Sequence, residues 1–144
     1  MSKPRSNDLK KVFLGGTCNK STWRDELIPL LEIKYFNPVV KEWTQKAQDE
    51  EYKQKEKADF CLYVITPRQT GFFTIAEVVS DSIKKPMKTI FCVLDKDKSD
   101  TPDSTILFSH SQMESLNAVC RMVKENGAKC FKSLNAVANY LNDR

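Results

Sequence analysis

Short apolar runs alternate with longer charged or amphipathic segments along the chain. A run of about 4–8 apolar residues bounded by Gly, Pro or polar residues is typical of a buried strand. Apolar residues at helical spacing indicate an amphipathic helix. The pattern predicts strands at residues 12–16, 32–36, 59–65, 88–94 and 128–131. It predicts helices at residues 22–31, 43–57, 74–85, 112–125 and 133–141, and a charged loop at residues 95–104.

The order of these elements indicates one fold class. Residues 59–65 and 88–94 are almost entirely apolar, as expected of parallel strands covered on both faces. Strands that alternate with helices form parallel sheets with right-handed crossovers. We therefore expect a three-layer α/β fold whose five-stranded parallel sheet is doubly wound in the flavodoxin-like order 2-1-3-4-5. Ligands bind such folds where the strands end, which directs attention to residues 15–21, 37–40 and 66–73.

Two predicted helix starts resemble capping boxes. Thr22 is followed three residues later by Asp25, and Thr74 is followed by Glu77. In a capping box the two side chains satisfy backbone N–H groups at the helix N-terminus. This interpretation makes Glu77 a structural residue.

Two of the predicted helices differ in how they should pack. The helix after the third strand carries Ile75, Val79 and Ile83 as an apolar stripe. The helix at residues 43–57 is rich in Lys, Glu, Gln and Asp. We expect that helix to be solvated, with Trp43 and Ala47 as its apolar contacts.

Length and composition fit a single domain. The chain has 144 residues, 40% of them hydrophobic and 29% charged, which is enough to bury a sizeable core. Residues 1–10 are polar and predict a flexible tail, so the domain is expected at residues 11–144. The tail lacks the apolar core of a signal peptide, and no apolar run reaches the roughly 18 residues that span a membrane. No membrane partner is expected.

Charge and metal-ligand patterns narrow the function further. The net charge of +4 comes from lysines spread along the chain rather than from a basic stripe, so nucleic-acid binding is not expected. The five cysteines include no C-x-x-C pair, which indicates free thiols in a reducing, cytoplasmic setting. The only histidine, His110, has no Cys or Asp at metal-ligand spacing. We expect neither a metal site nor a cofactor.

The first predicted strand ends in Gly15, Gly16 and Thr17, just before a helix. Glycines let the backbone approach a ligand, and a helix N-terminus favours an anion. A tight strand-to-helix turn explains the same residues equally well. The segment matches neither G-x-G-x-x-G nor G-K-[ST], which excludes the two common nucleotide fingerprints.

Trp23 and Arg24 open the first predicted helix. A Trp ring can stack on a base, and an Arg guanidinium can bind a phosphate through two hydrogen bonds. The alternative is that Trp23 covers the sheet and Arg24 is a surface cation, because Leu27 and Leu30 lie on the helix face that carries Trp23.

Two carboxylates bracket the third strand and the loop that follows it. Glu77, in the first turn of the next helix, can project beside that loop, where the helix dipole favours an ionised carboxylate. An ionised, positioned carboxylate is what a glycosyl-transfer nucleophile requires. Asp59 opens the strand, so sheet geometry places it away from the expected crevice, and a structural cap is the alternative.

Several segments, in this order, closely resemble the nucleoside 2-deoxyribosyltransferase-like family over residues 11–94. They are Lys11-Val-Phe-Leu-Gly-Gly-Thr17, Trp23-Arg-Asp-Glu-Leu-Ile-Pro-Leu30, Tyr35-Phe-Asn-Pro-Val39, Glu42-Trp43, Ala58-Asp-Phe60, Tyr63-Val-Ile-Thr-Pro67 and the stretch from Gly71 to Glu77.

The resemblance implies a flavodoxin-like fold and cleavage of the N-glycosidic bond of a nucleoside or nucleotide. It implies that Glu77 is the nucleophile that forms a covalent glycosyl-enzyme, and it favours a catalytic or supporting role for Asp59. It also implies a homo-oligomer, a dimer or higher, because sites in the family often borrow residues from a neighbouring subunit. Taken together, the pattern and the resemblance indicate substrate contacts at Gly15, Gly16, Thr17, Trp23, Asn37, Pro38, Thr66, Gly71 and Phe72.

One position departs from the family pattern. Deoxyribosyltransferases carry an acid six residues before the nucleophile, where this chain has Gly71. Hydrolysis is therefore as well supported as base exchange. The proton donor for the leaving base stays open between Asp59, Tyr63 and a residue of a partner chain. Two other functions fit the same fold: a non-catalytic nucleotide-binding module, and an NAD-cleaving domain similar to Toll/interleukin-1 receptor-like modules.

Overall fold

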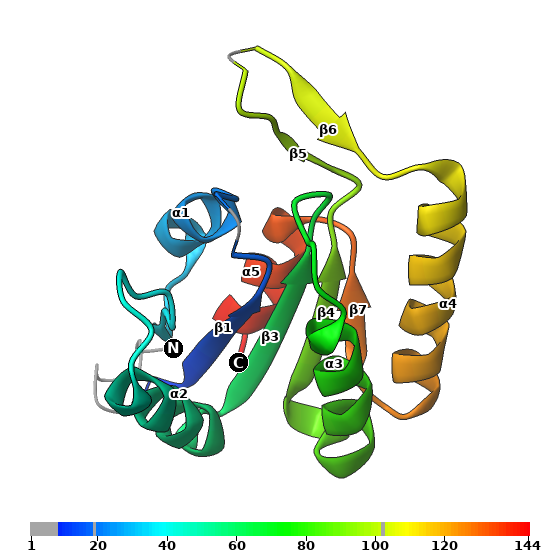
Figure 1. Cartoon of the computed structure of the whole chain (residues 1–144). Coiled ribbons are helices and arrows are strands. Elements are labelled where there is room, and N and C mark those ends of the chain that lie inside the picture. The colour runs from blue at the N-terminus through cyan, green and yellow to red at the C-terminus, as the bar shows by residue number, and fades with distance from the viewer. Residues whose placement is uncertain (1–8, 19, 102) are drawn as a thin grey trace.

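The computed structural model describes residues 9–18, 20–101 and 103–144. At its centre lies a five-stranded sheet in the order β2-β1-β3-β4-β7, in which every pairing is parallel (Figure 1). Its strands are β1 (Lys11–Gly16), β2 (Lys34–Phe36), β3 (Phe60–Ile65), β4 (Thr89–Val93) and β7 (Lys129–Phe131). The predicted fold class and the order 2-1-3-4-5 are confirmed. Most of the expected tail at residues 1–10 falls outside the described residues.

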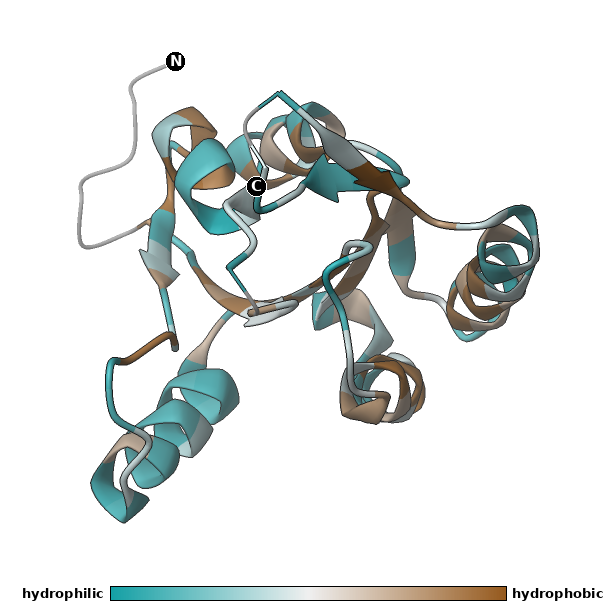
Figure 2. Cartoon of the chain, turned by 45° about the horizontal axis from the view of Figure 1, so that its top comes forward, coloured by the Kyte–Doolittle hydropathy of each residue, from teal (hydrophilic) through white to brown (hydrophobic). Residues whose placement is uncertain are grey.

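Helices cover both faces of the sheet (Figure 2). One face carries α1 (Trp23–Leu27), which continues as the 3-10 turn η2 (Ile28–Leu30), and α5 (Leu134–Asn142). The other face carries α2 (Gln45–Lys57), α3 (Phe73–Lys84) and α4 (His110–Glu125), and the turn η3 (Pro86–Lys88) leads into β4. Within the described ranges, none of the helices combines the length and the apolar character that crossing a membrane requires.

Alternate residues of β3 supply two hydrophobic cores. Leu62 and Val64 pack in the core shared with α1 and α5, whereas Tyr63 and Ile65 pack in the core shared with α3 and α4. All of β3 is buried, as its apolar run predicts. Helix α2 contributes no buried residue and is hydrophilic along most of its length (Figure 2). The space between α2 and α3 is consequently lined mainly by polar side chains.

Both predicted capping boxes are wrong. Helix α3 begins at Phe73 with Phe72 as its N-cap, which leaves Thr74 inside the first turn without a capping bond. Thr22 does precede α1, but its hydroxyl forms no capping hydrogen bond. Glu77 therefore lies too deep in α3 to reach the N-cap. The predicted cap at Ser133 is present, because its side chain accepts a hydrogen bond from the Ala136 N–H.

The predicted apolar stripe of α3 is right at its start and wrong at its end. Val78 is fully buried, with Ile75 and Val79 packed beside it, whereas Ile83 is 65% exposed. Each step of four residues along a helix adds about 40° beyond a full turn. After two such steps from Ile75, the Ile83 side chain lies on a helix face that points away from the sheet. The predicted apolar contact of α2 at Trp43 is also wrong, because Trp43 precedes the helix and is 60% exposed.

The predicted charged loop at residues 95–104 contains a strand, β5 (Lys96–Lys98), which pairs antiparallel with β6 (Thr105–Leu107) directly after the loop. This hairpin projects past the carboxyl ends of the sheet strands (Figure 1). Lys and Asp alternate along β5, so apolar periodicity gave no strand signal. The Asp97 carboxylate accepts a hydrogen bond from Ser21, and the Lys98 carbonyl accepts one from Arg68. These contacts tie the hairpin to the loops after β1 and β3.

Candidate functional site

A cavity of about 380 Å³ lies at the carboxyl edge of the sheet, where β1, β2 and β3 end, and Glu77 forms part of its wall. This is the position at which doubly wound sheets bind ligands. A second, more open space of about 720 Å³ extends between α2 and α3 and shares Trp43, Glu51 and Glu77 with the first. The first cavity is otherwise lined by Phe13, Gly15, Gly16, Cys18, Arg24, Pro38, Val39, Val40, Tyr63 and Thr74.

The Glu77 carboxylate is held by a cation from the facing helix. The Lys55 ammonium of α2 donates a hydrogen bond to Glu77 Oε2 at 3.0 Å. Both side chains are largely withdrawn from solvent, with 18% of Lys55 and 26% of Glu77 exposed. Burial alone lowers the pKa of Lys55, but the hydrogen bond to Glu77 and the charges of Glu77 and Asp81 outweigh it and raise that pKa. Lys55 therefore stays charged and fixes one oxygen of Glu77.

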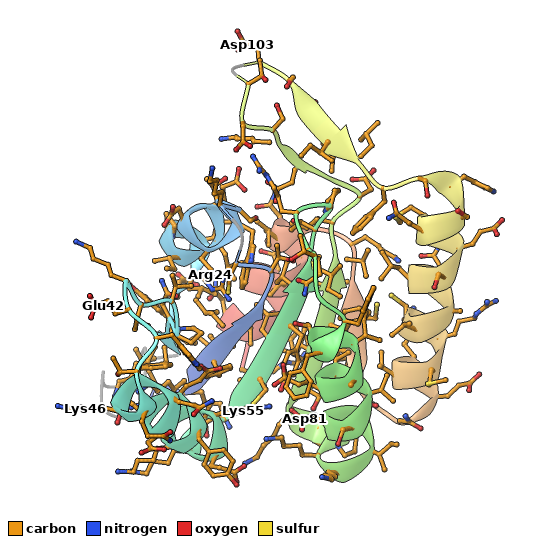
Figure 3. All side chains as sticks on the ribbon, viewed as in Figure 1. Arg24, Glu42, Lys46, Lys55, Asp81 and Asp103 are labelled. Carbon is orange, nitrogen blue, oxygen red and sulfur yellow. The ribbon has the colours of Figure 1, made fainter. Side chains whose placement is uncertain are left out.

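Asp81, one turn after Glu77 on α3, lies close to Lys55 of α2 (Figure 3). Its carboxylate lies 3.6 Å from the Lys55 ammonium and accepts a hydrogen bond from the Tyr63 hydroxyl. Burial raises the pKa of Tyr63, and the hydrogen bond to Asp81 raises it further. The Tyr63 hydroxyl therefore stays protonated and donates its hydrogen bond to Asp81.

The loop after β1 forms the floor of the cavity, and its backbone requires glycine. Gly16 has φ +117°, and a Cβ atom there would lie 2.1 Å from the Val64 carbonyl oxygen. The hydroxyl of Thr17 is buried and binds Gln69 Oε1 at 2.7 Å and the Thr66 N–H at 3.0 Å. Thr17 therefore joins the loops after β1 and β3, and supports the cavity from below.

Arg24 lines the cavity, and the alternative that it is a surface cation is wrong. It is only 5% exposed, and its guanidinium donates to the carbonyl oxygens of Leu14 at 2.9 Å and Thr17 at 2.8 Å. It also lies over the ring of Trp23, and burial lowers the pKa of Arg24. Arg24 fixes the end of β1 while facing the cavity. Trp23 is buried in the core, does not line this cavity, and donates its ring N–H to Thr17.

Asp59 lies at the opposite end of the strands from the cavity, directly before β3 begins. Its carboxylate accepts a hydrogen bond from the Lys11 backbone N–H at 2.8 Å, where β1 and β3 begin. Asp59 lines neither space that contains Glu77. The structure therefore separates the two carboxylates that the sequence grouped together.

The remaining residues predicted to contact substrate differ in their positions relative to the cavity. Pro38 lines the cavity, whereas the Asn37 side chain accepts a hydrogen bond from the Val39 N–H and shapes that loop. Thr66 is fully buried and bonds to the Arg68 N–H. Phe72 is 86% exposed, and a Cβ atom added to Gly71 would meet nothing within 4 Å. Packing therefore does not dictate glycine at position 71.

Three residues of the site escaped prediction from the sequence: Glu51, Lys55 and Asp81. Glu51 and Lys55 belong to the helix expected to be a solvated surface, and Asp81 to the helix face expected to be solvated. The available signal was the i, i+4 spacing of Glu51 with Lys55 and of Glu77 with Asp81, which places each pair on one helix face. Nothing in one sequence showed that these two faces meet.

Comparison with known proteins identifies the family of the chain. A family model described as nucleoside 2-deoxyribosyltransferase like matches residues 9–97, which include the sheet edge, α2, α3 and every residue of the Glu77 network. No curated protein and no solved structure matches the chain. The family match covers more than half of the chain and supports a nucleoside-processing function. The chain belongs to the nucleoside 2-deoxyribosyltransferase-like family.

Proposed function

We propose that this protein cleaves the N-glycosidic bond of a nucleoside or nucleotide, with Glu77 as the nucleophile. The observation that carries the proposal is the carboxylate of Glu77, which lies in the wall of the carboxyl-edge cavity and is fixed by Lys55. Glycoside cleavage needs a carboxylate close to an oxocarbenium-like transition state. Membership of a nucleoside-processing family supplies the substrate class.

The contacts of Glu77 suit nucleophilic attack. Lys55 binds Oε2, which leaves Oε1 to attack the anomeric carbon while the bond to the base breaks. The product of this step is a glycosyl ester of Glu77. Water resolves the ester in a hydrolase, and a second base resolves it in a transferase. In this proposal Gly15, Gly16 and Pro38 form the wall against the sugar, and Asp59 supports the site by holding β1 against β3.

The proposal includes a homo-oligomer in the cytoplasm. Exposed apolar side chains flank the cavity, among them Val40, Trp43 and Phe73. Such a rim favours a second copy of the chain beside the site. Analytical ultracentrifugation of the wild type and of Trp43→Ser checks this part separately.

A product screen tests the activity. The wild-type protein is incubated with a panel of nucleosides, nucleotides and NAD, with and without an acceptor base, and products are separated by chromatography. We expect free base from a nucleoside or nucleotide and at least a 10³-fold loss of that product with Glu77→Gln, by analogy with other nucleophile deletions. Glu125→Gln, on the exposed side of α4, is the matched control. Tight binding without any product would favour a nucleotide-binding module, and cleavage of NAD alone would favour the Toll/interleukin-1 receptor-like alternative.

A further inference from the structure

Two cysteines meet at the edge of the sheet opposite β2, away from the Glu77 cavity. Cys130 lies on the edge strand β7, paired with Phe91 of β4, and packs against the core that β3 and β4 share with α4. Cys120 lies on the buried face of α4, which covers this side of the sheet. The Cys130 thiol donates a hydrogen bond to the Cys120 sulfur. Both cysteines are free, so the contact joins two reduced sulfur atoms.

A lysine places its charge against the Cys120 sulfur. The Lys132 ammonium, just after β7, donates a hydrogen bond to Cys120 Sγ at 3.5 Å and another to Asn117 Oδ1. Cys120, Asn117 and Lys132 line an open space of about 540 Å³. The other side chains around this space are those of Glu114, Arg121 and Lys124. A small polar molecule can therefore reach the sulfur in a predominantly cationic environment.

The two thiols differ in acidity. The hydrogen bond from Cys130 lowers the pKa of Cys120, burial opposes this, and the charges of Lys132 and Lys124 lower it further. The hydrogen bond to Cys120 and burial raise the pKa of Cys130. Cys120 is therefore the thiolate of the pair and Cys130 the thiol. A thiolate beside a lysine is the form of cysteine that reacts with electrophiles.

The other two core cysteines lack this character. Burial raises the pKa of Cys61, and it raises that of Cys92 to about 12. Both lie in the central strands of the sheet and are fully buried. Buried thiols of this kind are inert. They provide an internal comparison for the pair at the sheet edge.

We propose that Cys120 and Cys130 are an oxidisable dithiol, in which Cys120 reacts with a hydroperoxide and Cys130 then closes a reversible disulfide. In the first step the Cys120 sulfur bonds to one peroxide oxygen, the O–O bond breaks, and the departing oxyanion takes a proton from water. In the second step the Cys130 sulfur bonds to Cys120, the S–O bond breaks, and water leaves with the Cys130 proton. The two sulfur atoms together lose two electrons, which reduce the peroxide.

The geometry favours closure of the disulfide within one chain. Cys120 and Cys130 are already in contact, so the S–S bond needs little movement of α4 against β7. A short turn that includes Gly127 connects the two elements. Disulfides in a reducing compartment are usually transient and serve catalysis or redox sensing, which is the kind of bond proposed here.

Peptide mapping of the full-length protein tests this proposal. The reduced protein is treated with an equimolar amount of hydrogen peroxide, free thiols are alkylated, and tryptic peptides are identified by mass spectrometry. Trypsin separates the two cysteines, because Arg121, Lys124 and Lys129 lie between them. We expect the Cys120–Cys130 disulfide to form at least about tenfold faster than any other cysteine is oxidised. Dithiothreitol should reverse it.

Variants assign the role of each side chain. In Cys130→Ser, oxidation should stop at a Cys120 sulfenic acid, which dimedone labels. Lys132→Met should slow the oxidation of Cys120 by about tenfold near neutral pH, because the thiolate loses its cation. Lys129→Met, at an exposed position of the same strand, is the matched control and should leave the rate unchanged.

The outcomes that overturn the proposal are equally specific. Faster oxidation of Cys18, Cys61 or Cys92 in the wild type would do so, as would a disulfide between two chains. An unchanged rate of Cys120 oxidation in a folded Lys132→Met variant would overturn the role of the lysine. The mapping of the wild type decides the main claim even if a variant fails to fold.

Discussion

The Lys55 ammonium lies 3.0 Å from Glu77 Oε2 and 3.6 Å from Asp81 Oδ2, so one cation of α2 pairs with two carboxylates of α3. Asp81 has a second, more distant cation in Lys85, at 3.9 Å. The Lys55 bridge is the only hydrogen-bonded side-chain link between α2 and α3 in the described part of the chain. Because α2 buries no apolar residue of its own, the bridge has two roles. It holds the helix against the site, and it orients Glu77.

Lys55→Met is expected to damage both roles. With the cation removed, Glu77 loses its partner in a half-buried site, while Asp81 keeps Lys85 and the Tyr63 hydroxyl. The loss should lower the free energy of unfolding by about 1–3 kcal/mol. Misplacement of Glu77 should lower kcat by about 10–100-fold with a smaller change in KM. Urea denaturation and steady-state kinetics measure the two effects. Lys55→Arg should recover part of both, and Lys53→Met on the exposed side of α2 should show neither.

The same bridge predicts how stability depends on pH. The pKa of Lys55 is raised in the folded protein above its ordinary 10.5. A raised pKa contributes stability that is fully present below the unfolded value and is lost as the pH rises through the folded value. The stability difference between wild type and Lys55→Met should therefore stay constant between about pH 7 and pH 9, and shrink above about pH 10.5. A difference that already shrinks near pH 8 contradicts this assignment.

Gly16→Ala is expected to be severely destabilising. The residue has φ +117°, and the added Cβ would lie 2.1 Å from the Val64 carbonyl oxygen, so the end of β1 must move. We expect a loss of about 3 kcal/mol or more in the free energy of unfolding. Gly71→Ala is the matched control, because its Cβ enters open space, and should change stability by less than about 0.5 kcal/mol. Thermal unfolding followed by circular dichroism compares the two variants.

Arg24→Met should destabilise the protein through the carbonyl groups that it leaves behind. The buried Leu14 oxygen loses both guanidinium donors and the Thr17 oxygen keeps only the Trp23 ring N–H, at a cost of about 1–3 kcal/mol. Arg24→Lys should rescue little of this loss, because an ammonium cannot reproduce the planar fork. Arg121→Met, on the exposed side of α4, serves as the control. Stability of Arg24→Lys equal to wild type would show that charge alone suffices at this position.

Asp59 is expected to act on stability more than on chemistry. Asp59→Asn keeps an oxygen that can accept from the Lys11 N–H and should stay within about 0.5 kcal/mol of wild type. Asp59→Ala removes that acceptor and should cost about 1 kcal/mol. Both variants should retain turnover within a few-fold. A large loss of kcat in a fully folded Asp59→Asn variant would contradict this prediction and support a catalytic role for Asp59.

Sequence periodicity predicted the sheet well, because buried parallel strands such as Phe60–Ile65 are marked by unbroken apolar runs. Periodicity failed for two elements whose structure does not depend on an apolar pattern. The β5–β6 hairpin consists largely of charged and polar residues, and α3 begins one residue before its apparent Thr74 cap. The nucleophile came from the family resemblance, since spacing alone favoured a capping role for Glu77. Its partners could not be predicted, because Glu51 and Lys55 look like ordinary surface charges until α2 is placed beside α3.

The most direct test of the central claim is to trap the glycosyl–Glu77 ester. A nucleoside or nucleotide with fluorine at C2′ destabilises the oxocarbenium-like transition state and slows breakdown of the ester. Intact-protein mass spectrometry should then show one added sugar on the wild type, and peptide mapping should place it on Glu77. The Glu77→Gln variant should show no adduct. An adduct on another residue, or continued release of base by a folded Glu77→Gln protein, would contradict the account.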